Sequence, residues 1–242
     1  VDPDRERLRL VKHATEAYWA GDCSQAALHD TARSLRLRHW TQQQEAGIDL
    51  IPSNDFSFYD QVLDTIAMVG AVPPRFNWDG DTVDLDTYFA MARGVQEKQV
   101  DASNSDDAGA PAMEMTKWYD TNYHYIVPEF DADQAFSLSS TKAVDAYTEA
   151  READIETRPV LLGPVSFLLL GKMQTPDAEV LDLLDALLPV YAEVLQQLSD
   201  AGASAVQIDE PHLVMDLSDA ERQAFRQAYD ALSNAADVDL AL

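Results

Sequence analysis

RPVLLGP, residues 158–164, is a short apolar run that ends at a Gly-Pro pair. Apolar residues at successive positions are typical of a strand that is buried on both faces. A long amphipathic helix is predicted over residues 177–199, and SAVQIDEP at 204–211 is predicted to be a second buried strand that ends in carboxylates. Strand, helix and strand in this order indicate two parallel strands joined by a crossover helix.

The same alternation continues outward from this unit in both directions. It predicts an α/β fold, and the expected architecture is a (βα)8 TIM-type barrel. About five of the eight strands of such a barrel can be counted, so residues 1–242 are expected to form one domain with an incomplete barrel. Further helices are predicted over residues 4–20, 24–44, 57–70, 86–92, 141–153 and 218–232, and further strands at IDLIP (48–52), within 113–130 and at VDLAL (238–242).

Polar side chains follow the predicted strands directly. Asn54 and Asp55 come after the strand at 48–52, and Asp209 and Glu210 end SAVQIDEP. In a (βα) barrel the carboxyl ends of the strands form the rim at which ligands bind. Asp209 and Glu210 could act there as acid and base or hold an amine or a metal; they could equally cap the following helix or form structural ion pairs.

The chain is strongly acidic. It has 17 lysines and arginines against 43 aspartates and glutamates, a formal net charge of −26 over 242 residues. A field of this sign repels nucleic acids and anionic membrane surfaces, so neither is expected as a partner. No apolar run approaches the length of a membrane span, about 18 residues, and VDPDRERLRLVKHA at the start of the chain has no apolar signal core.

Cysteine and histidine are too few and too scattered to form a zinc motif. The single cysteine, Cys23, excludes a disulfide within the chain and a cysteine-rich zinc site, and it fits a reducing, cytoplasmic setting. The five histidines have no partner at metal-ligand spacing. We therefore expect no metal site and no cofactor within these residues.

Three basic residues stand out against the acidic background. Arg5, Arg9 and Lys12 are spaced i, i+4 and i+7, so they share one face of the first predicted helix. Such a face can bind the carboxylates or phosphates of a ligand. It can also form ordinary ion pairs with the acidic surface, and the spacing alone leaves both interpretations open.

The stretch MEMTKWYDTNYHYIVPEF, residues 113–130, combines many aromatic residues with a lysine, an amide and an imidazole. It follows residues 94–111, which lack periodicity and are predicted to form a flexible loop. Aromatic residues at this density are typical of a strand in a buried sheet. On such a strand Asn122 and His124 would share one face, and His124 would be either a hydrogen-bonded core residue or a rim residue.

Lys117 lies between Met115 and Trp118 in this stretch, where a largely buried position is expected. A buried ammonium group needs a counter-charge. Glu114 or Asp120 could supply it within the chain. The other interpretation is that Lys117 meets an anionic ligand that reaches under the loop at 94–111.

Five segments resemble, in order, the N-terminal half of cobalamin-independent methionine synthase. They extend over nearly the whole chain and are RLVKHATEAYWAGD, IPSNDFSFYDQVLDTIAMVGAVPPRF, EMTKWYDTNYHYIVPEF, RPVLLGPVSFLLLGK and VQIDEPHLV. The resemblance implies one of two (βα)8 barrels in an enzyme that transfers a methyl group from 5-methyltetrahydrofolate polyglutamate to homocysteine. It also implies that zinc, which binds homocysteine as the thiolate, belongs to the C-terminal barrel and not to this chain.

The resemblance further implies a set of substrate-binding residues. Arg9 and Lys12 match the family's Arg-x-x-Lys on the first helix, although His13 stands where a second lysine is common. Lys117 matches the lysine of the family's Glu-Met-Thr-Lys-Trp motif, and Asn122 is taken as a candidate neighbour at the rim. These cations suit the folate tail, because each of its glutamates carries a carboxylate.

The sequence departs from the family pattern in two places. VDPDRE stands where the family has a Gly-Phe-Pro-Arg-type strand, and the chain ends at VDLAL, where the family continues into further strands and the zinc barrel. The first and last barrel strands are thus expected to be missing, Asp209 and Glu210 to be structural, and the fragment to hold no catalytic residue and to be inactive alone. The alternatives are a non-catalytic scaffold and a stand-alone folate-binding module.

Overall fold

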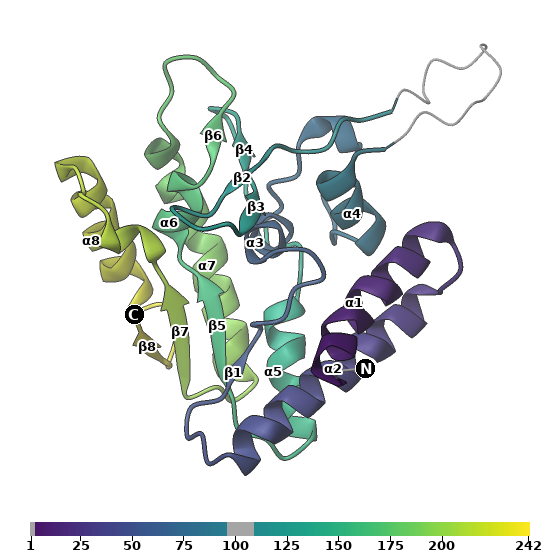
Figure 1. Ribbon diagram of the computed structural model, residues 1–242. Helices are drawn as coiled ribbons and strands as arrows, with labels where there is room; N and C mark the ends of the chain where they lie inside the picture. Colours follow the sequence, from purple (N-terminus) through teal and green to yellow (C-terminus); the bar gives the residue numbers. More distant parts are fainter. Residues whose placement is uncertain (1–2, 96–108) are drawn as a thin grey trace, which may run out of the picture.

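The computed structural model describes the backbone of residues 3–95 and 109–242 and the side chains of residues 10–95 and 109–242 (Figure 1). The helices are α1 (Pro3–Ala20), α2 (Gln25–Glu45), α3 (Gln61–Met68), α4 (Leu85–Arg93), α5 (Lys142–Glu152), α6 (Pro164–Leu169), α7 (Leu184–Asp200) and α8 (Asp219–Leu232), with the 3-10 turns η1 (Pro74–Phe76), η2 (Val180–Leu183) and η3 (Pro211–Val214). The strands are β1 (Pro52–Ser53), β2 (Met115–Lys117), β3 (His124–Ile126), β4 (Glu129–Phe130), β5 (Arg158–Leu162), β6 (Lys172–Met173), β7 (Ala205–Asp209) and β8 (Asp239–Ala241).

A parallel sheet forms the centre of the fold. Its four strands lie in the order β1-β5-β7-β8, and every neighbouring pair is parallel. The predicted unit of strand, helix and strand is confirmed, since α7 crosses from β5 back to β7 (Figure 1). The chain is therefore an α/β protein with a parallel sheet of four strands, and the strand pairings among the described residues do not close this sheet into a barrel.

The two faces of the sheet differ in character. Leu161 of β5 and Ile208 of β7 are buried, and α5 and α7 lie behind this face in Figure 1. The Tyr191 hydroxyl of α7 donates to the Leu162 carbonyl at 2.7 Å, which ties the helix to β5. On the other face a polar row crosses the strands, because Arg158 donates to Gln207 at 2.6 Å.

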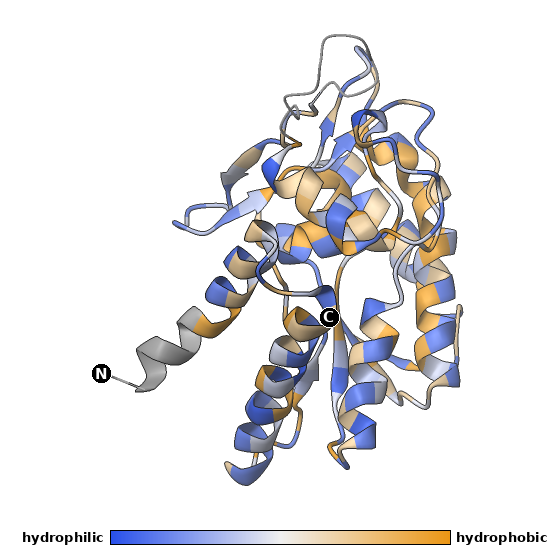
Figure 2. Cartoon of the chain, turned by 90° about the vertical axis from the view of Figure 1, so that its right-hand side faces the viewer, coloured by the Kyte–Doolittle hydropathy of each residue, from blue (hydrophilic) through white to orange (hydrophobic). Residues whose placement is uncertain are grey.

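The amphipathic helices follow their apolar periodicity. The structure confirms the helices predicted over 4–20, 24–44, 86–92, 141–153 and 218–232, with ends shifted by a few residues, whereas the helix predicted over 177–199 begins only at Leu184, after the 3-10 turn η2. Figure 2 shows the hydrophobic residues as patches along the helices, as expected for helices that bury one side. Among the described residues, none of the helices combines the length and the apolar character needed to cross a membrane.

The aromatic stretch 113–130 contains strands, as predicted, but they are three short strands and not one strand of the central sheet. β2 and β3 form an antiparallel hairpin in which Lys117 pairs with His124, and β4 pairs in parallel with β6. The turn between β2 and β3 contains Tyr119 with φ of 47°, a left-handed conformation, and the Trp118 N–H donates to the Tyr123 carbonyl at 2.7 Å. Thr121 supports the turn, because its hydroxyl donates to the Trp118 carbonyl at 2.6 Å and accepts the Tyr123 N–H at 3.2 Å.

Two further differences have local causes. α6 was not predicted, because VSFLLL is apolar at every position except Ser166 and such a run carries no helical period, and β6, with two residues, is too short to show an alternation. The helix predicted over 57–70 begins later, at Gln61, where the Asp60 side chain caps it by accepting the N–H groups of Val62 and Leu63. The flexible loop predicted at 94–111 falls mostly on residues 96–108, which lie outside the described residues.

Candidate functional site

The basic face predicted on α1 is only partly described. Lys12 is exposed, and its ammonium group lies 3.7 Å from Glu16 in an i, i+4 pair. Such a surface pair contributes little and leaves a lysine free to exchange partners. The side chains of Arg5 and Arg9 lie outside the described residues, so the anion-binding interpretation of this face stays a prediction.

Lys117 is exposed, which corrects the expectation that it would be buried. The reason is that β2 is the outer strand of a two-stranded hairpin, with only its middle residue partly covered. Glu114, one of the two expected structural partners, is occupied by Lys172, whose ammonium group lies 2.6 and 2.7 Å from its carboxylate oxygens. Within the described residues, the Lys117 ammonium group makes no hydrogen bond or ion pair. This arrangement leaves a cation available to an anionic ligand.

Asn122 and His124 do not share a strand face, because Asn122 lies in the turn and only His124 belongs to β3. Both side chains are exposed, so His124 is not a core histidine. The His124 Nδ1 lies 3.0 Å from the Asn122 carbonyl. The structure therefore brings Lys117, Asn122 and His124 together on one hairpin.

The two predicted groups of binding residues lie apart. Figure 1 shows α1 separated from the β2–β3 hairpin, with α4 between them. The end of α1 packs on α4 through Tyr18, whose hydroxyl donates to Asp86 at 2.5 Å, and through Trp19, which stacks edge-on against Phe89. A ligand that meets both Lys12 and Lys117 would have to extend across α4 or its neighbourhood.

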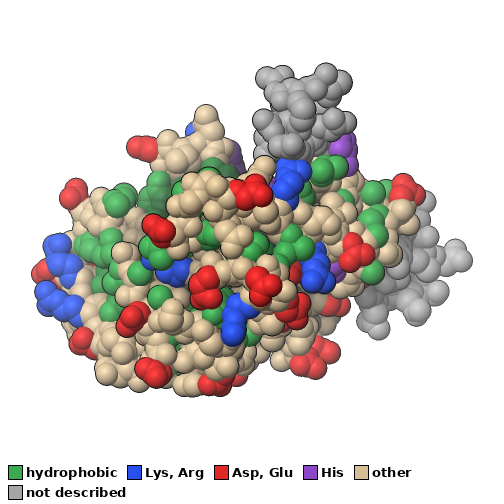
Figure 3. All heavy atoms as spheres, turned by 90° about the horizontal axis from the view of Figure 1, so that it is seen from below, with side chains coloured by type: hydrophobic (Ala, Val, Ile, Leu, Met, Phe, Trp, Pro, Cys, Tyr) green, Lys and Arg blue, Asp and Glu red, His purple; other side chains and the backbone are tan. Residues whose placement is uncertain are grey.

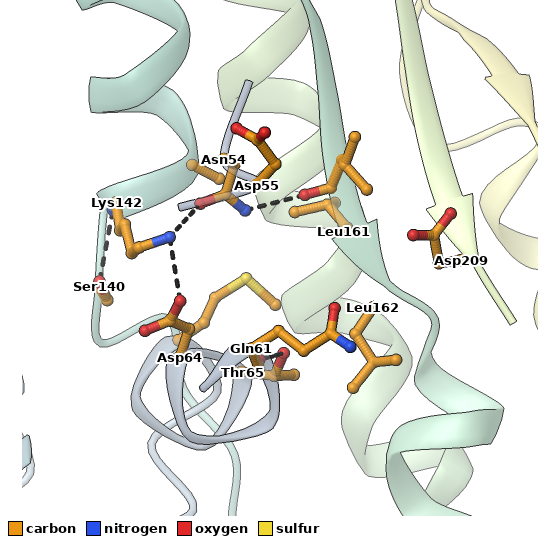
Figure 4. Close-up of a pocket in the computed structure, with 13 residues that line it drawn as sticks. Asn54, Asp55, Gln61, Asp64, Thr65, Ser140, Lys142, Leu161, Leu162 and Asp209 are labelled. Carbon is orange, nitrogen blue, oxygen red and sulfur yellow. Dashed lines mark hydrogen bonds and ion pairs between the residues drawn. The ribbon is translucent and has the colours of Figure 1, made fainter. Parts of the chain in front are cut away.

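Polar residues gather at the carboxyl ends of the sheet strands, as the sequence predicts. Asn54 follows β1 with φ of 63°, a conformation that asparagine tolerates. Its side-chain amide donates to the Val160 carbonyl at 2.9 Å, and its oxygen accepts from Lys142 at 2.7 Å. Lys142 also pairs with Asp64 at 3.1 Å. Figure 4 shows these groups at one side of a cavity of about 130 Å³, with Asp209 across it at the end of β7.

Lys142 was missed by sequence reasoning. It stands at the start of α5, 88 residues from Asn54, and no local pattern connects the two. The sequence signal for this cluster was the position of Asn54 directly after a strand. This position predicts that other polar side chains lie nearby, but it does not identify them. Because Lys142 already bonds Asn54 and Asp64, little of its charge remains for an anion.

A larger cavity of about 420 Å³ opens beside this cluster, between α2, α4 and α5. Phe56 and Phe58 form an edge-on aromatic pair in its wall, with ring centroids 5.5 Å apart. Arg36, a second cation of the wall, is held by two hydrogen bonds to Glu149 of 2.6 and 3.0 Å. The cavity therefore suits an uncharged group better than a carboxylate, since both of its basic residues are paired.

Glu210 is a structural carboxylate. It is 7% exposed, and its oxygens accept the N–H groups of Ser166 at 2.7 Å and Val165 at 3.3 Å, at the start of α6. The Tyr229 hydroxyl donates to it at 2.7 Å. Burial raises the pKa of Glu210, and the bonds from Ser166 and Tyr229 oppose that shift. One oxygen of Asp209 accepts from Gln207 at 2.8 Å, whereas Glu210 has partners on both oxygens within the protein.

The residues present do not fit a zinc site. Among side chains 10–95 and 109–242, no group of three or more His, Cys, Asp and Glu is placed to hold a metal ion. Cys23, the only thiol of the sequence, is half-buried at the start of α2. No step of a mechanism is therefore derived through a metal in this chain.

Comparison with known proteins was made on the whole chain. The family model described as "Cobalamin-independent synthase, N-terminal domain" matches residues 5–242. The chain is 65% identical over 232 residues to a 5-methyltetrahydropteroyltriglutamate–homocysteine methyltransferase of Salinibacter ruber, 55% identical over 228 residues to one of Chelativorans sp. and 53% identical over 245 residues to one of Caulobacter vibrioides. These alignments include 94–98% of the chain but only 30–31% of the length of each relative.

Proposed function

The chain belongs to the family of cobalamin-independent synthase N-terminal domains, and on this premise we propose that it supplies folate binding to a methyltransferase. The proposed reaction moves a methyl group from 5-methyltetrahydropteroyltriglutamate, a folate polyglutamate, to homocysteine and yields methionine. The names of the three relatives contain both substrates. Since the chain spans about 30% of their length, we propose that homocysteine and any zinc are bound by the remainder of such a polypeptide and that this chain alone is inactive.

The observation that carries the proposal is the exposed Lys117. In a chain of net charge −26, an ammonium group without a partner among the described residues is a ready site for a carboxylate. We propose that Lys117 binds the polyglutamate tail, with Asn122 beside it on the hairpin. Arg9 and Lys12 on α1 would then provide a second contact, reached by a part of the tail that lies away from the hairpin.

The chemical role proposed for these residues is binding and orientation. A tail carboxylate held by Lys117 loses translational freedom, and so does the folate attached to it. No proton or bond transfer is assigned to Asp209 or Glu210, because their oxygens are engaged by Gln207, α6 and Tyr229. The catalytic groups of the transfer would come from outside this chain.

The same premise extends to the architecture. We propose that residues 1–242 are one barrel domain in which the four parallel strands described here form part of a (βα)8 barrel. The polar row of Arg158 and Gln207 would then face the barrel interior. A cytoplasmic location belongs to the proposal too, and the single free cysteine is compatible with it.

The test is a calorimetric titration of the chain with 5-methyltetrahydropteroyl monoglutamate and triglutamate. We expect the triglutamate to bind more tightly, and we expect Lys117→Ala to weaken its binding by about tenfold through loss of a charge-assisted hydrogen bond, with a smaller effect on the monoglutamate. Arg222→Ala is the matched control, because it removes one exposed positive charge on α8, which pairs only with Asp219 among the described residues.

Three results would count against the proposal. Equal affinity for mono- and triglutamate would rule out tail recognition by this chain. If Lys117→Ala changed stability but left both affinities unaltered, the alternative of a non-catalytic scaffold would be favoured. Tight triglutamate binding without any enhancement of methyl transfer by a relative's remaining part would favour a stand-alone binding module.

A further inference from the structure

We propose that Asp60 is a positioning residue for the hairpin that carries Lys117: its carboxylate joins β3 to the first turn of α3 and so fixes where the ligand-binding lysine stands. The inference rests on the proposed function, since it takes Lys117 as a ligand contact. Asp60 itself lies outside the proposed binding surface. Its bond to the Ile126 N–H can be probed in the absence of any ligand.

The carboxylate of Asp60 bridges two elements. One oxygen accepts the N–H groups of Val62 at 2.7 Å and Leu63 at 3.0 Å, which caps α3. The other oxygen accepts the N–H of Ile126 in β3 at 3.0 Å. Asp60 is 1% exposed and Ile126 is 0% exposed, so water cannot replace either bond.

The bond to Ile126 is the polar anchor of the hairpin edge that faces α3. Ile126 pairs with Met115 across the hairpin, and its N–H points away from β2, toward Asp60. Without an acceptor this buried N–H would be unsatisfied, which is costly in a dry interior. β2 itself is mostly exposed, so the place of Lys117 depends on how β3 is held.

The pairing of β2 with β3 connects Lys117 to the bond between Ile126 and Asp60. Met115 pairs with Ile126 and Lys117 with His124, so the lysine stands two pairs of residues further along the same ladder. The second polar anchor of β3 is Tyr125, whose hydroxyl donates to the Leu170 carbonyl at 3.0 Å after α6. Release of the Ile126 bond would leave the hairpin attached through this tyrosine, its apolar contacts and two bonds that precede β2, from the Met113 N–H to the Met91 carbonyl at 2.8 Å and from Lys172 to Glu114.

Asp60 is not part of an ion pair in the described residues. The nearest cationic cluster is already balanced, because Lys142 pairs with Asp64 at 3.1 Å. Burial raises the pKa of Asp60 to about 6, so the carboxylate is ionised at neutral pH and can accept all three N–H groups. The tyrosines around it, Tyr59, Tyr88 and Tyr123, have raised pKa values and stay neutral under the same conditions.

The substitution Asp60→Asn separates the capping of α3 from the bond to β3. Asparagine is as good a helix cap as aspartate, but its single oxygen cannot serve α3 and β3 together, and its NH2 group would face an N–H donor. Asp84→Asn is the matched control. Asp84 caps α4 by accepting the Thr87 N–H at 2.7 Å, is exposed and makes no bond to the hairpin among those described.

Selective 15N labelling of isoleucine provides the readout in the ligand-free chain. The sequence has six isoleucines, of which Ile126 reports the hairpin, Ile66 lies in α3 and Ile208 lies in β7. In Asp60→Asn we expect the Ile126 amide to exchange with solvent about tenfold faster or more, with Ile66 and Ile208 unchanged. Asp84→Asn should leave all three as in the wild type. An unchanged Ile126 in folded Asp60→Asn, or faster exchange at Ile66 alone, would overturn the inference.

Titration with 5-methyltetrahydropteroyltriglutamate then tests the consequence for binding. Asp60→Asn should weaken binding by about tenfold, the same order as Lys117→Ala, and combining the two substitutions should add little because they act on one contact. Wild-type affinity in an Asp60→Asn variant whose Ile126 amide is released would overturn the positioning role. Absence of triglutamate binding to the wild-type chain would instead overturn the proposed function, whatever Ile126 shows.

Discussion

At the scale of single residues, Asp60 shows that a buried carboxylate can accept three hydrogen bonds and still have its charged form disfavoured relative to water. Burial outweighs the three bonds from backbone N–H groups and raises its pKa from 3.8 to about 6. The native state thus binds a proton here more tightly than the unfolded chain does. By linkage, the stabilising contribution of this group is fully present below pH 3.8 and is lost as pH rises through about 6.

This sign leads to a pH prediction. The difference in free energy of unfolding between the wild type and Asp60→Asn should shift by about 1 kcal/mol toward the variant when pH rises from about 5 to about 7.5. Urea unfolding of both proteins at the two pH values measures it, and the difference cancels all other titrating groups. A difference that stays constant, or that moves toward the wild type, would show that Asp60 titrates near its unfolded pKa.

The sequence identified the chemistry of the hairpin lysine but not its surroundings. A lysine between aromatic residues indicated either a ligand contact or a buried ion pair, and the exposure of Lys117 and the pairing of Glu114 with Lys172 favour the ligand. Neither fact is local: Lys172 is 58 residues away from Glu114. Lys142 was not predicted for the same reason, because residues that meet only through the tertiary fold show no characteristic spacing in the sequence.

At the scale of elements, the joint between β5, α6 and β7 is built around Glu210. Its carboxylate caps the first turn of α6, directly below Gly163, which links β5 to that helix. A Cβ atom at Gly163 would overlap the carboxyl group of Glu210. Glycine is required here by the close approach of a side chain and not by its backbone, whose φ of −71° any residue can adopt.

A double-mutant cycle tests this joint. Gly163→Ala should cost about 2 kcal/mol of unfolding free energy because it forces Glu210 aside, and Glu210→Ala about 3 kcal/mol because it leaves buried N–H groups unpaired. The double variant should be about as stable as Glu210→Ala alone, since the clash is gone. Additive losses, measured by urea unfolding, would mean that Gly163 is needed for a reason other than Glu210.

Helices were predictable where apolar residues recur in the sequence with a helical period. α2, α5, α7 and α8 have buried residues at helical spacing with polar ones between, and their presence followed from the sequence. β2 and β3 have three residues each, too few for an alternation to be recognised. Their hairpin depends on the turn at Tyr119 and on the bond from Ile126 to Asp60, which is a tertiary contact.

At the scale of the whole molecule, negative charge dominates. Figure 3 shows Asp and Glu side chains scattered over the face seen from below, with fewer Lys and Arg between them. The excess amounts to −26 charges in 242 residues, and repulsion within it opposes the compact state. The same field would repel the proposed anionic folate tail, and local cations such as Lys117 would act against that repulsion.

Screening by salt should therefore stabilise the fold and weaken the Lys117 contact. Between about 0.1 and about 1 M KCl the Debye length falls from ~10 Å to ~3 Å, which screens both the repulsion and the Lys117 contact. We expect the melting temperature to rise over this range, and the affinity for 5-methyltetrahydropteroyltriglutamate to fall less steeply in Lys117→Ala than in the wild type, because the variant has lost the screened contact. Sucrose at matched osmolality is the control for effects of solute other than screening. A melting temperature that falls with KCl would show that ion pairs such as Arg36–Glu149 outweigh the repulsion, and equal salt slopes in both proteins would remove Lys117 from the binding surface.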